Sequence, residues 1–158
     1  MKLINFLSGL FTCKSGIVKS IEINHFDYMV KRDWDKTYWF FDIHGTILKP
    51  NYKAGNTPKD FYPLAKETLQ YLSTLKDVVM ILYTCSHPHE IQEYLTLFEA
   101  NNIHFSYVNE NPEVPTDING YGCYDKKPYV NVLFEDKAGF DPESDWTGVL
   151  KLMKSRNE

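Results

Sequence analysis

The chain of 158 residues predicts an α/β fold, a three-layer sandwich with a mostly parallel central sheet. Short continuous apolar runs, typical of strands buried on both faces, alternate with segments whose apolar residues recur at helical spacing. Three of these runs stop abruptly at polar residues, namely Asp42, Thr84 and Glu135. Alternating strands and helices predict right-handed crossovers. Ligands bind such sheets beyond the carboxyl ends of the strands, so we expect the functional site there.

Residues 1–36 are expected to form an N-terminal appendage. The apolar side chains of residues 1–11 recur at helical spacing, which predicts a short amphipathic packing helix. An export signal and a membrane-surface anchor are the alternatives for this segment. The next part is rich in β-branched and aromatic residues, and we expect a short pair of strands at residues 19–23 and 26–30.

Residues 37–158 are long enough to form one domain with its own core. The apolar runs predict strands at residues 38–41, 78–83, 105–108 and 130–134. Helical spacing predicts helices at residues 64–75 and 90–100, and a last helix that includes residues 146–153. Proline, glycine and asparagine mark loops at residues 49–59 and 112–122.

Composition limits the classes of partner and compartment. The net charge is −4 and the basic residues are mixed with acidic ones, so we expect no stable nucleic-acid binding. The three cysteines, Cys13, Cys85 and Cys123, form no CxxC pair, which predicts neither a disulfide framework nor a zinc site and favours a reducing cytoplasm. No apolar run is long enough to cross a bilayer.

The segment at residues 41–46, FDIHGT, follows an apolar strand and resembles the Asp-x-Asp-Gly-Thr motif of the haloacid dehalogenase (HAD)-like superfamily of phosphatases. The later motifs of that superfamily also occur in order, as Thr84, Lys127 and the pair Glu135-Asp136. The resemblance covers roughly residues 38–141. It implies a Rossmann-type core and a Mg²⁺-dependent phosphomonoester hydrolase, in which Asp42 forms an aspartyl-phosphate.

The chemistry of the residues agrees with this resemblance. A carboxylate attacks a phosphoryl group only when the negative charges are neutralised, and Mg²⁺ prefers hard oxygen ligands. Asp42, Asp136 and the main-chain carbonyl of His44 would supply such ligands, with Glu135 and Asp141 as further acids. The alternative for Asp42 is a turn or helix-capping residue, and for Glu135 and Asp136 it is a pair of surface charges.

The resemblance implies that Thr84 donates a hydrogen bond to a phosphate oxygen, with Cys85 beside it. It also implies that Lys127 holds both Asp42 and the phosphate by charge. Lys126 is adjacent and is the alternative for that role. Both lysines would otherwise be solvated loop charges, and Thr84 would otherwise cap the following helix.

His44 is the main departure from the superfamily pattern, because it replaces the second Asp, which is the usual general acid and base. Imidazole is able to carry protons near neutral pH, so His44 is a candidate substitute. The alternatives are an enzyme that stalls at the aspartyl-phosphate and a binding protein without turnover.

The gaps between the motifs are too short for a large cap domain, so an open site is expected. The substrate would be a small phosphorylated molecule or an accessible macromolecular end, and several aromatic residues are candidates to stack on it: Tyr52, Phe61, Tyr62, Tyr121 and Tyr124. The second hypothesis is a phosphate-binding or regulatory module on the same fold. The third is a membrane-associated adaptor anchored by residues 1–11. Neither the substrate nor the oligomeric state follows from the sequence.

Overall fold

The computed structural model describes residues 15–51, 53, 55–120 and 122–157. Four parallel strands form one sheet in the order β3-β2-β1-β4. The strands are β1 (Thr37–Phe41), β2 (Val78–Leu82), β3 (Tyr107–Val108) and β4 (Val132–Phe134). The helices are α1 (Gly16–Ile21), the π-helix η1 (Glu22–Asp27), α2 (Tyr28–Arg32), α3 (Ala65–Leu72), α4 (Pro88–Glu99), the 3₁₀ turn η2 (Asp136–Ala138) and α5 (Asp145–Asn157).

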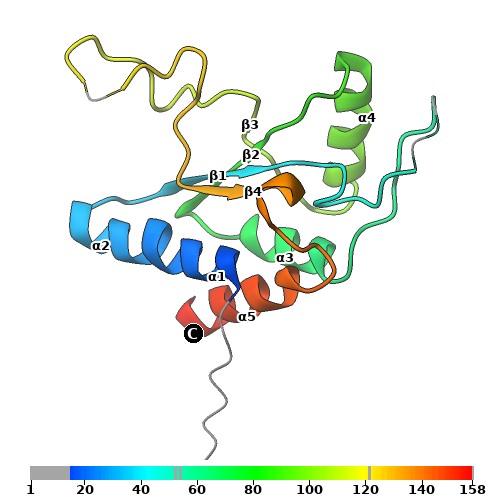
Figure 1. Cartoon of the computed structure of the whole chain (residues 1–158), viewed down its shortest axis with the longest axis horizontal. Helices are drawn as coiled ribbons and strands as arrows, with labels where there is room; N and C mark the ends of the chain where they lie inside the picture. The colour runs from blue at the N-terminus through cyan, green and yellow to red at the C-terminus, as the bar shows by residue number, and fades with distance from the viewer. Residues whose placement is uncertain (1–14, 52, 54, 121, 158) are drawn as a thin grey trace, which may run out of the picture.

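One face of the sheet carries the main core. Trp39 and Phe41 of β1 point into it, and buried residues of α1, α3, α4 and α5 belong to the same cluster. The connections β1-α3-β2 and β2-α4-β3 step across the sheet in one direction, so right-handed crossovers bring both helices to this face. Figure 1 shows α1, α2, α3 and α5 together below the sheet.

The other face of the sheet is covered by an irregular segment, residues 109–131, instead of helices. Tyr38, Phe40, Val79 and Ile81 alternate with the residues of the main core and form a second cluster with side chains of this segment. The connection from β3 back to β4 runs opposite to the earlier crossovers, which places it on the opposite face (Figure 1, yellow). The predicted α/β parallel-sheet sandwich is thus confirmed, with an irregular third layer.

The predicted pair of strands at residues 19–23 and 26–30 is wrong, because this segment is helical from α1 through η1 to α2. The buried residues of the segment are Ile17, Val18, Ile21 and His25, a helical spacing. Packing of this face against the core overrides the β-propensity of the residues. Helix α1 contacts α5 and β4, so Ile17, Val18 and Ile21 belong to the main core.

The other predicted elements are present, with shorter bounds for the outer strands. The predicted strand at 105–108 is reduced to two residues, and that at 130–134 to three. Between β1 and α3, and between β3 and β4, the described residues contain no further helix or strand. The amphipathic helix expected at residues 1–11 lies outside the described residues. Among the helices of the described part, none is long and apolar enough to span a membrane.

Candidate functional site

Asp42 directly follows β1 and is held in place by the sheet. Its backbone N–H donates to the carbonyl of Phe134 at 3.0 Å, and the carbonyl of the preceding Phe41 accepts from Tyr83 N–H at 2.8 Å. The strand is buried along all five residues, whereas the Asp42 side chain is half-buried. The buried strand therefore delivers a partly desolvated carboxylate to the edge where parallel strands bind ligands.

A cavity of about 320 Å³ lies at this edge. Among its lining residues are four that the sequence predicted for the site: Asp42, Thr84, Cys85 and Glu135. Lys126 also lines the cavity, whereas Lys127 is not among the lining residues. The structure thus places the alternative lysine, rather than the favoured one, in the same cavity as Asp42.

Three carboxylates gather at the ends of β1 and β4. Asp42, Glu135 and Asp136 each offer an oxygen atom within 4.8 Å of the others. Burial is the main cause that raises the pKa of Asp42, and the nearby Asp136 raises it further. Burial and the hydrogen bond with Asp136 raise the pKa of Glu135. Like charges held this closely favour either a proton or a cation between them.

Lys137, which sequence reasoning missed, supplies one positive charge to this cluster. Its Nζ lies 3.2 Å from Asp136 Oδ1 and 3.6 Å from Glu135 Oε1. Burial acts to raise the pKa of Asp136, but hydrogen bonds with Glu135 and Lys137 outweigh it and hold that pKa below its usual value. The Lys137 side chain is 80% exposed, so it is free to leave when a ligand enters.

The turn after Asp42 brings the backbone close to Asp136. Gly45 has a φ of +83°, and a Cβ added to it would lie 2.7 Å from Asp136 Oδ2. The buried Thr46 accepts a hydrogen bond from Asp136 N–H through Oγ1 at 3.1 Å. Gly45 and Thr46 thus form a cradle that holds Asp136 in place. The carboxylates of Asp42, Glu135 and Asp136 together offer three hard oxygen donors, a donor set that suits Mg²⁺.

Asn109 is a second residue that sequence reasoning missed. Its side chain accepts from Thr84 N–H and donates to the Thr84 carbonyl, both at 2.8 Å. Asn109 lines the cavity and directly follows β3. The signal for it was available, since it is a polar residue at a strand end like Asp42 and Thr84. The Thr84 hydroxyl lies 3.0 Å from that of Ser86 and also accepts from Ser86 N–H.

His44 lines a different cavity from Asp42. That cavity, of about 400 Å³, lies between α4 and the loop after β1 and includes Glu90 and Tyr94. His44 Nε2 lies 2.6 Å from the hydroxyl of Tyr94, and burial lowers the pKa of His44 below its ordinary value of 6.5. Burial, followed by the nearby Glu90 and Glu93, raises the pKa of Tyr94 to about 12. The protonated phenol is therefore able to donate to a neutral imidazole.

Asp141 is not brought to the acidic cluster. Its Oδ1 accepts from Glu143 N–H at 3.1 Å and its Oδ2 from the Ser144 hydroxyl at 2.7 Å. Its backbone N–H donates to Asp145 at the start of α5. These contacts give Asp141 a role in beginning α5.

Of three comparisons with known proteins, two give no match and one gives a solved structure with a similar fold. Neither a scan of protein-family models nor a search of curated proteins gives a match. Among solved structures, the chain is similar to a conserved protein from Bacteroides thetaiotaomicron, with 20% sequence identity and a TM-score of 0.56. The match covers 77% of this chain and 92% of that one. At this identity the likeness supports the α/β fold alone.

Proposed function

We propose that this chain is a Mg²⁺-dependent phosphomonoester hydrolase of the HAD-like superfamily that acts through an aspartyl-phosphate on Asp42. The observation that carries the proposal is one cavity at the carboxyl edge of a parallel sheet, lined by Asp42, Thr84, Lys126 and Glu135. It combines a nucleophile, a hydroxyl, a cation and a carboxylate suited to a metal. The sequence resemblance independently assigns these types of residue to phosphoryl transfer.

Asp42 would attack the phosphorus with one carboxylate oxygen. The bond from phosphorus to the leaving oxygen breaks, and that oxygen takes the bonding electron pair and requires a proton. Water then attacks the aspartyl-phosphate and releases inorganic phosphate and the Asp42 carboxylate. Because burial raises the pKa of Asp42, its ionised form is disfavoured as the pH falls toward that pKa. Rates should therefore decline on the acid side.

Asp42 and Asp136 would hold the magnesium ion, with Glu135 beside them. The bound ion would neutralise charge on the transferring phosphoryl group. Asp136 is fixed by the cradle of Gly45 and Thr46, so it needs little reorganisation. Lys137 would move aside as the ion takes over its neutralising charge.

Thr84 and Lys126 would bind the phosphate oxygens. The two hydrogen bonds with Asn109 fix the backbone of Thr84, which lines the cavity. Lys126 is exposed on the irregular segment, so its ammonium group would reach the phosphate without a large desolvation cost. At an effective dielectric constant of about 20, a cation about 4 Å from such an anion contributes about 4 kcal/mol before that cost.

The proton for the leaving group is the weak point of this site. With its pKa lowered, His44 is neutral at pH 7 and is a poor proton donor. Its Nε2 is also engaged by Tyr94. We therefore expect aryl phosphates, whose leaving groups need little protonation, to be cleaved faster than alkyl phosphates.

The position of His44 favours a second candidate function, a phosphate-binding or regulatory module without turnover. His44 and Asp42 line different cavities, so the residue at the position of the usual general acid does not line the cavity that would hold the phosphate. Such a module would bind phosphate and Mg²⁺ together and release no product.

Phosphate release from an aryl phosphate, with and without Mg²⁺, tests these alternatives in wild type, Asp42→Asn and His44→Asp. The hydrolase proposal expects Mg²⁺-dependent turnover that Asp42→Asn lowers by roughly a thousandfold or more. If wild type is silent and His44→Asp turns over, His44 has suppressed the activity. If all three are silent while phosphate and Mg²⁺ still bind, the module is the correct function.

A further inference from the structure

A cavity larger than the one that Asp42 lines lies away from the candidate active site. It has a volume of about 790 Å³ and opens beside the second face of the sheet. Its lining comes from the end of α2, from the segment between α2 and β1, from Tyr38 of β1 and from the irregular segment 109–131. A cavity of this size is large enough for a nucleotide-sized ligand.

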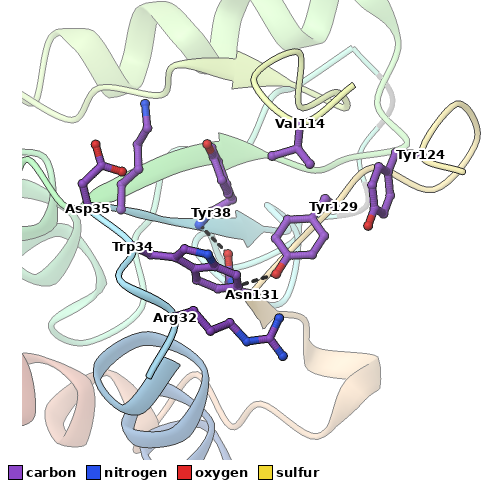
Figure 2. Close-up of a pocket in the computed structure, with 9 residues that line it drawn as sticks. Arg32, Trp34, Asp35, Tyr38, Val114, Tyr124, Tyr129 and Asn131 are labelled. Atoms are coloured by element: carbon purple, nitrogen blue, oxygen red, sulfur yellow. Dashed lines mark hydrogen bonds between the residues drawn. The ribbon is translucent and has the colours of Figure 1, made fainter. Parts of the chain in front are cut away.

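Aromatic rings dominate this cavity (Figure 2). Tyr129 lies among the other three rings and meets each of them edge to face. The distances from its ring centroid are 6.3 Å to Trp34, 6.3 Å to Tyr38 and 5.5 Å to Tyr124, and the angles between the ring planes are 87°, 82° and 77°. The Asn131 amide fixes Tyr129 by donating to its hydroxyl at 3.3 Å and accepts from Tyr38 N–H at 2.9 Å. Rings held in this manner offer preformed surfaces for a flat ligand.

Arg32 adds a positive charge at the edge of these rings. Its guanidinium carbon lies 4.7 Å from the Tyr28 centroid and 5.1 Å from the Trp34 centroid, so two rings hold it. Within the residues that the structure describes, no carboxylate makes an ion pair with Arg32. Lys36, the other basic lining residue, is paired with Glu113. In Figure 2 the Asp35 carboxylate points away from the rings.

We infer that this cavity is a second ligand site, which binds a planar aromatic group carrying a negative charge. The aromatic part would stack on Trp34 and its neighbours, while Arg32 would bind the anionic group through its planar fork of donors. The site is separate from the phosphate chemistry proposed for Asp42. The irregular segment nevertheless joins the two, because Tyr124 and Tyr129 line this cavity whereas Lys126 and Pro128 line the other.

Tryptophan fluorescence offers a direct test. Trp34 is half-buried in the cavity, whereas Trp39 and Trp146 are fully buried in the main core. Adenosine monophosphate and naphthalene-2-sulfonate would be titrated into the full chain with a chelator present, so that no metal-dependent hydrolysis interferes. We expect both probes to quench the fluorescence saturably, and neutral adenosine to bind about tenfold more weakly than its monophosphate.

Arg32→Gln should remove the preference for the monophosphate over adenosine, and Arg32→Lys should retain part of it. Arg156→Gln is the matched control, because Arg156 is also exposed and stacks on a ring, Phe26, at 5.2 Å, but lies outside the cavity. Asp42→Asn should leave quenching unchanged, which separates this site from the proposed hydrolase site. The inference is overturned if neither probe quenches in the millimolar range, if Arg32→Gln keeps the preference, or if Asp42→Asn abolishes quenching.

Discussion

At the scale of single residues, the contact between Gly45 and Asp136 decides whether the acidic cluster can form. The chain turns immediately after Asp42, and a positive φ at Gly45 lets the backbone approach the Asp136 carboxylate. A side chain at this position would meet Oδ2 at 2.7 Å and would also strain the backbone. A glycine is therefore required by two independent constraints.

Gly45→Ala is expected to lower the free energy of unfolding by about 1–3 kcal/mol and to weaken Mg²⁺ binding. Gly55→Ala is the matched control, because Gly55 has a similar φ of +71° but nothing lies within 4 Å of an added Cβ. The control should show only the backbone cost, with Mg²⁺ binding intact. Urea unfolding and isothermal titration with Mg²⁺ measure the two effects. Equal loss of Mg²⁺ binding in both variants would contradict this role for Gly45.

Adjacent lysines offer a second test at the residue scale. Lys126 lines the cavity of Asp42 and Lys127 does not, although both are exposed and differ by one position. We expect Lys126→Ala to raise the KM or Kd for a phosphorylated ligand by at least about tenfold, and Lys127→Ala to change it by less than about threefold. Steady-state kinetics or phosphate titration gives both values. The reverse order would restore Lys127 as the phosphate lysine.

At the scale of elements, His25 joins η1 to the start of β1. This fully buried side chain has Nδ1 2.7 Å from the Thr37 hydroxyl, which also accepts from Trp39 Nε1 at 2.8 Å. In the neutral tautomer with its proton on Nε2, His25 accepts from the Thr37 hydroxyl at Nδ1, and Nε2 lies 3.6 Å from Asp77 Oδ2. Burial is the main cause that lowers the pKa of His25, and Asp77 only partly offsets it.

A lowered pKa means that the unfolded chain binds a proton more readily than the folded chain. The His25 contribution to stability is therefore constant above the unfolded value of 6.5 and decreases as the pH falls from there toward the folded pKa, by at most about 1.4 kcal/mol per pH unit. Asp42 and Glu135 act with the opposite sign at lower pH, since their pKa values are raised. The difference between wild type and His25→Gln isolates the His25 contribution.

Urea unfolding between about pH 5 and pH 7.5 measures this difference. We expect wild type to lose its advantage over His25→Gln as the pH falls below 6.5, the ordinary value for histidine. A difference that stays constant over the whole range would mean that the folded and unfolded chains titrate His25 alike.

The elements also show what local sequence patterns can and cannot predict. The runs that became β1 and β2 were predictable because they are buried on both faces and allow no helical periodicity. The helices at residues 16–32 were mistaken for strands because their β-branched residues favour strands locally, whereas the deciding burial of Ile21 and His25 comes from contacts far along the chain. Burial of this kind is not visible in a short window.

At the scale of the whole molecule, the parallel topology brings the candidate site together. The strand-end rule placed Asp42, Thr84 and Glu135 in one cavity because their strands are parallel neighbours or share a neighbour in the sheet. Positions in loops were less predictable. Whether Lys126 or Lys127 lines the cavity depends on how the irregular segment 109–131 crosses the second face of the sheet. The orientation of the His44 side chain depends on its contact with Tyr94 of α4. No local pattern encodes either arrangement.

The N-terminal helices and the sheet share one core, which predicts that they unfold together. Ile21 is 0% exposed in the main core, whereas Ile23, two residues later, is 38% exposed. Ile21→Ala should lower the free energy of unfolding by about 2–5 kcal/mol, because it leaves a cavity, and Ile23→Ala should change it by less than about 1 kcal/mol. Circular dichroism and tryptophan fluorescence should follow the same urea transition in both variants. A separate early transition in Ile21→Ala would instead show that residues 15–36 unfold independently, as a detachable appendage would.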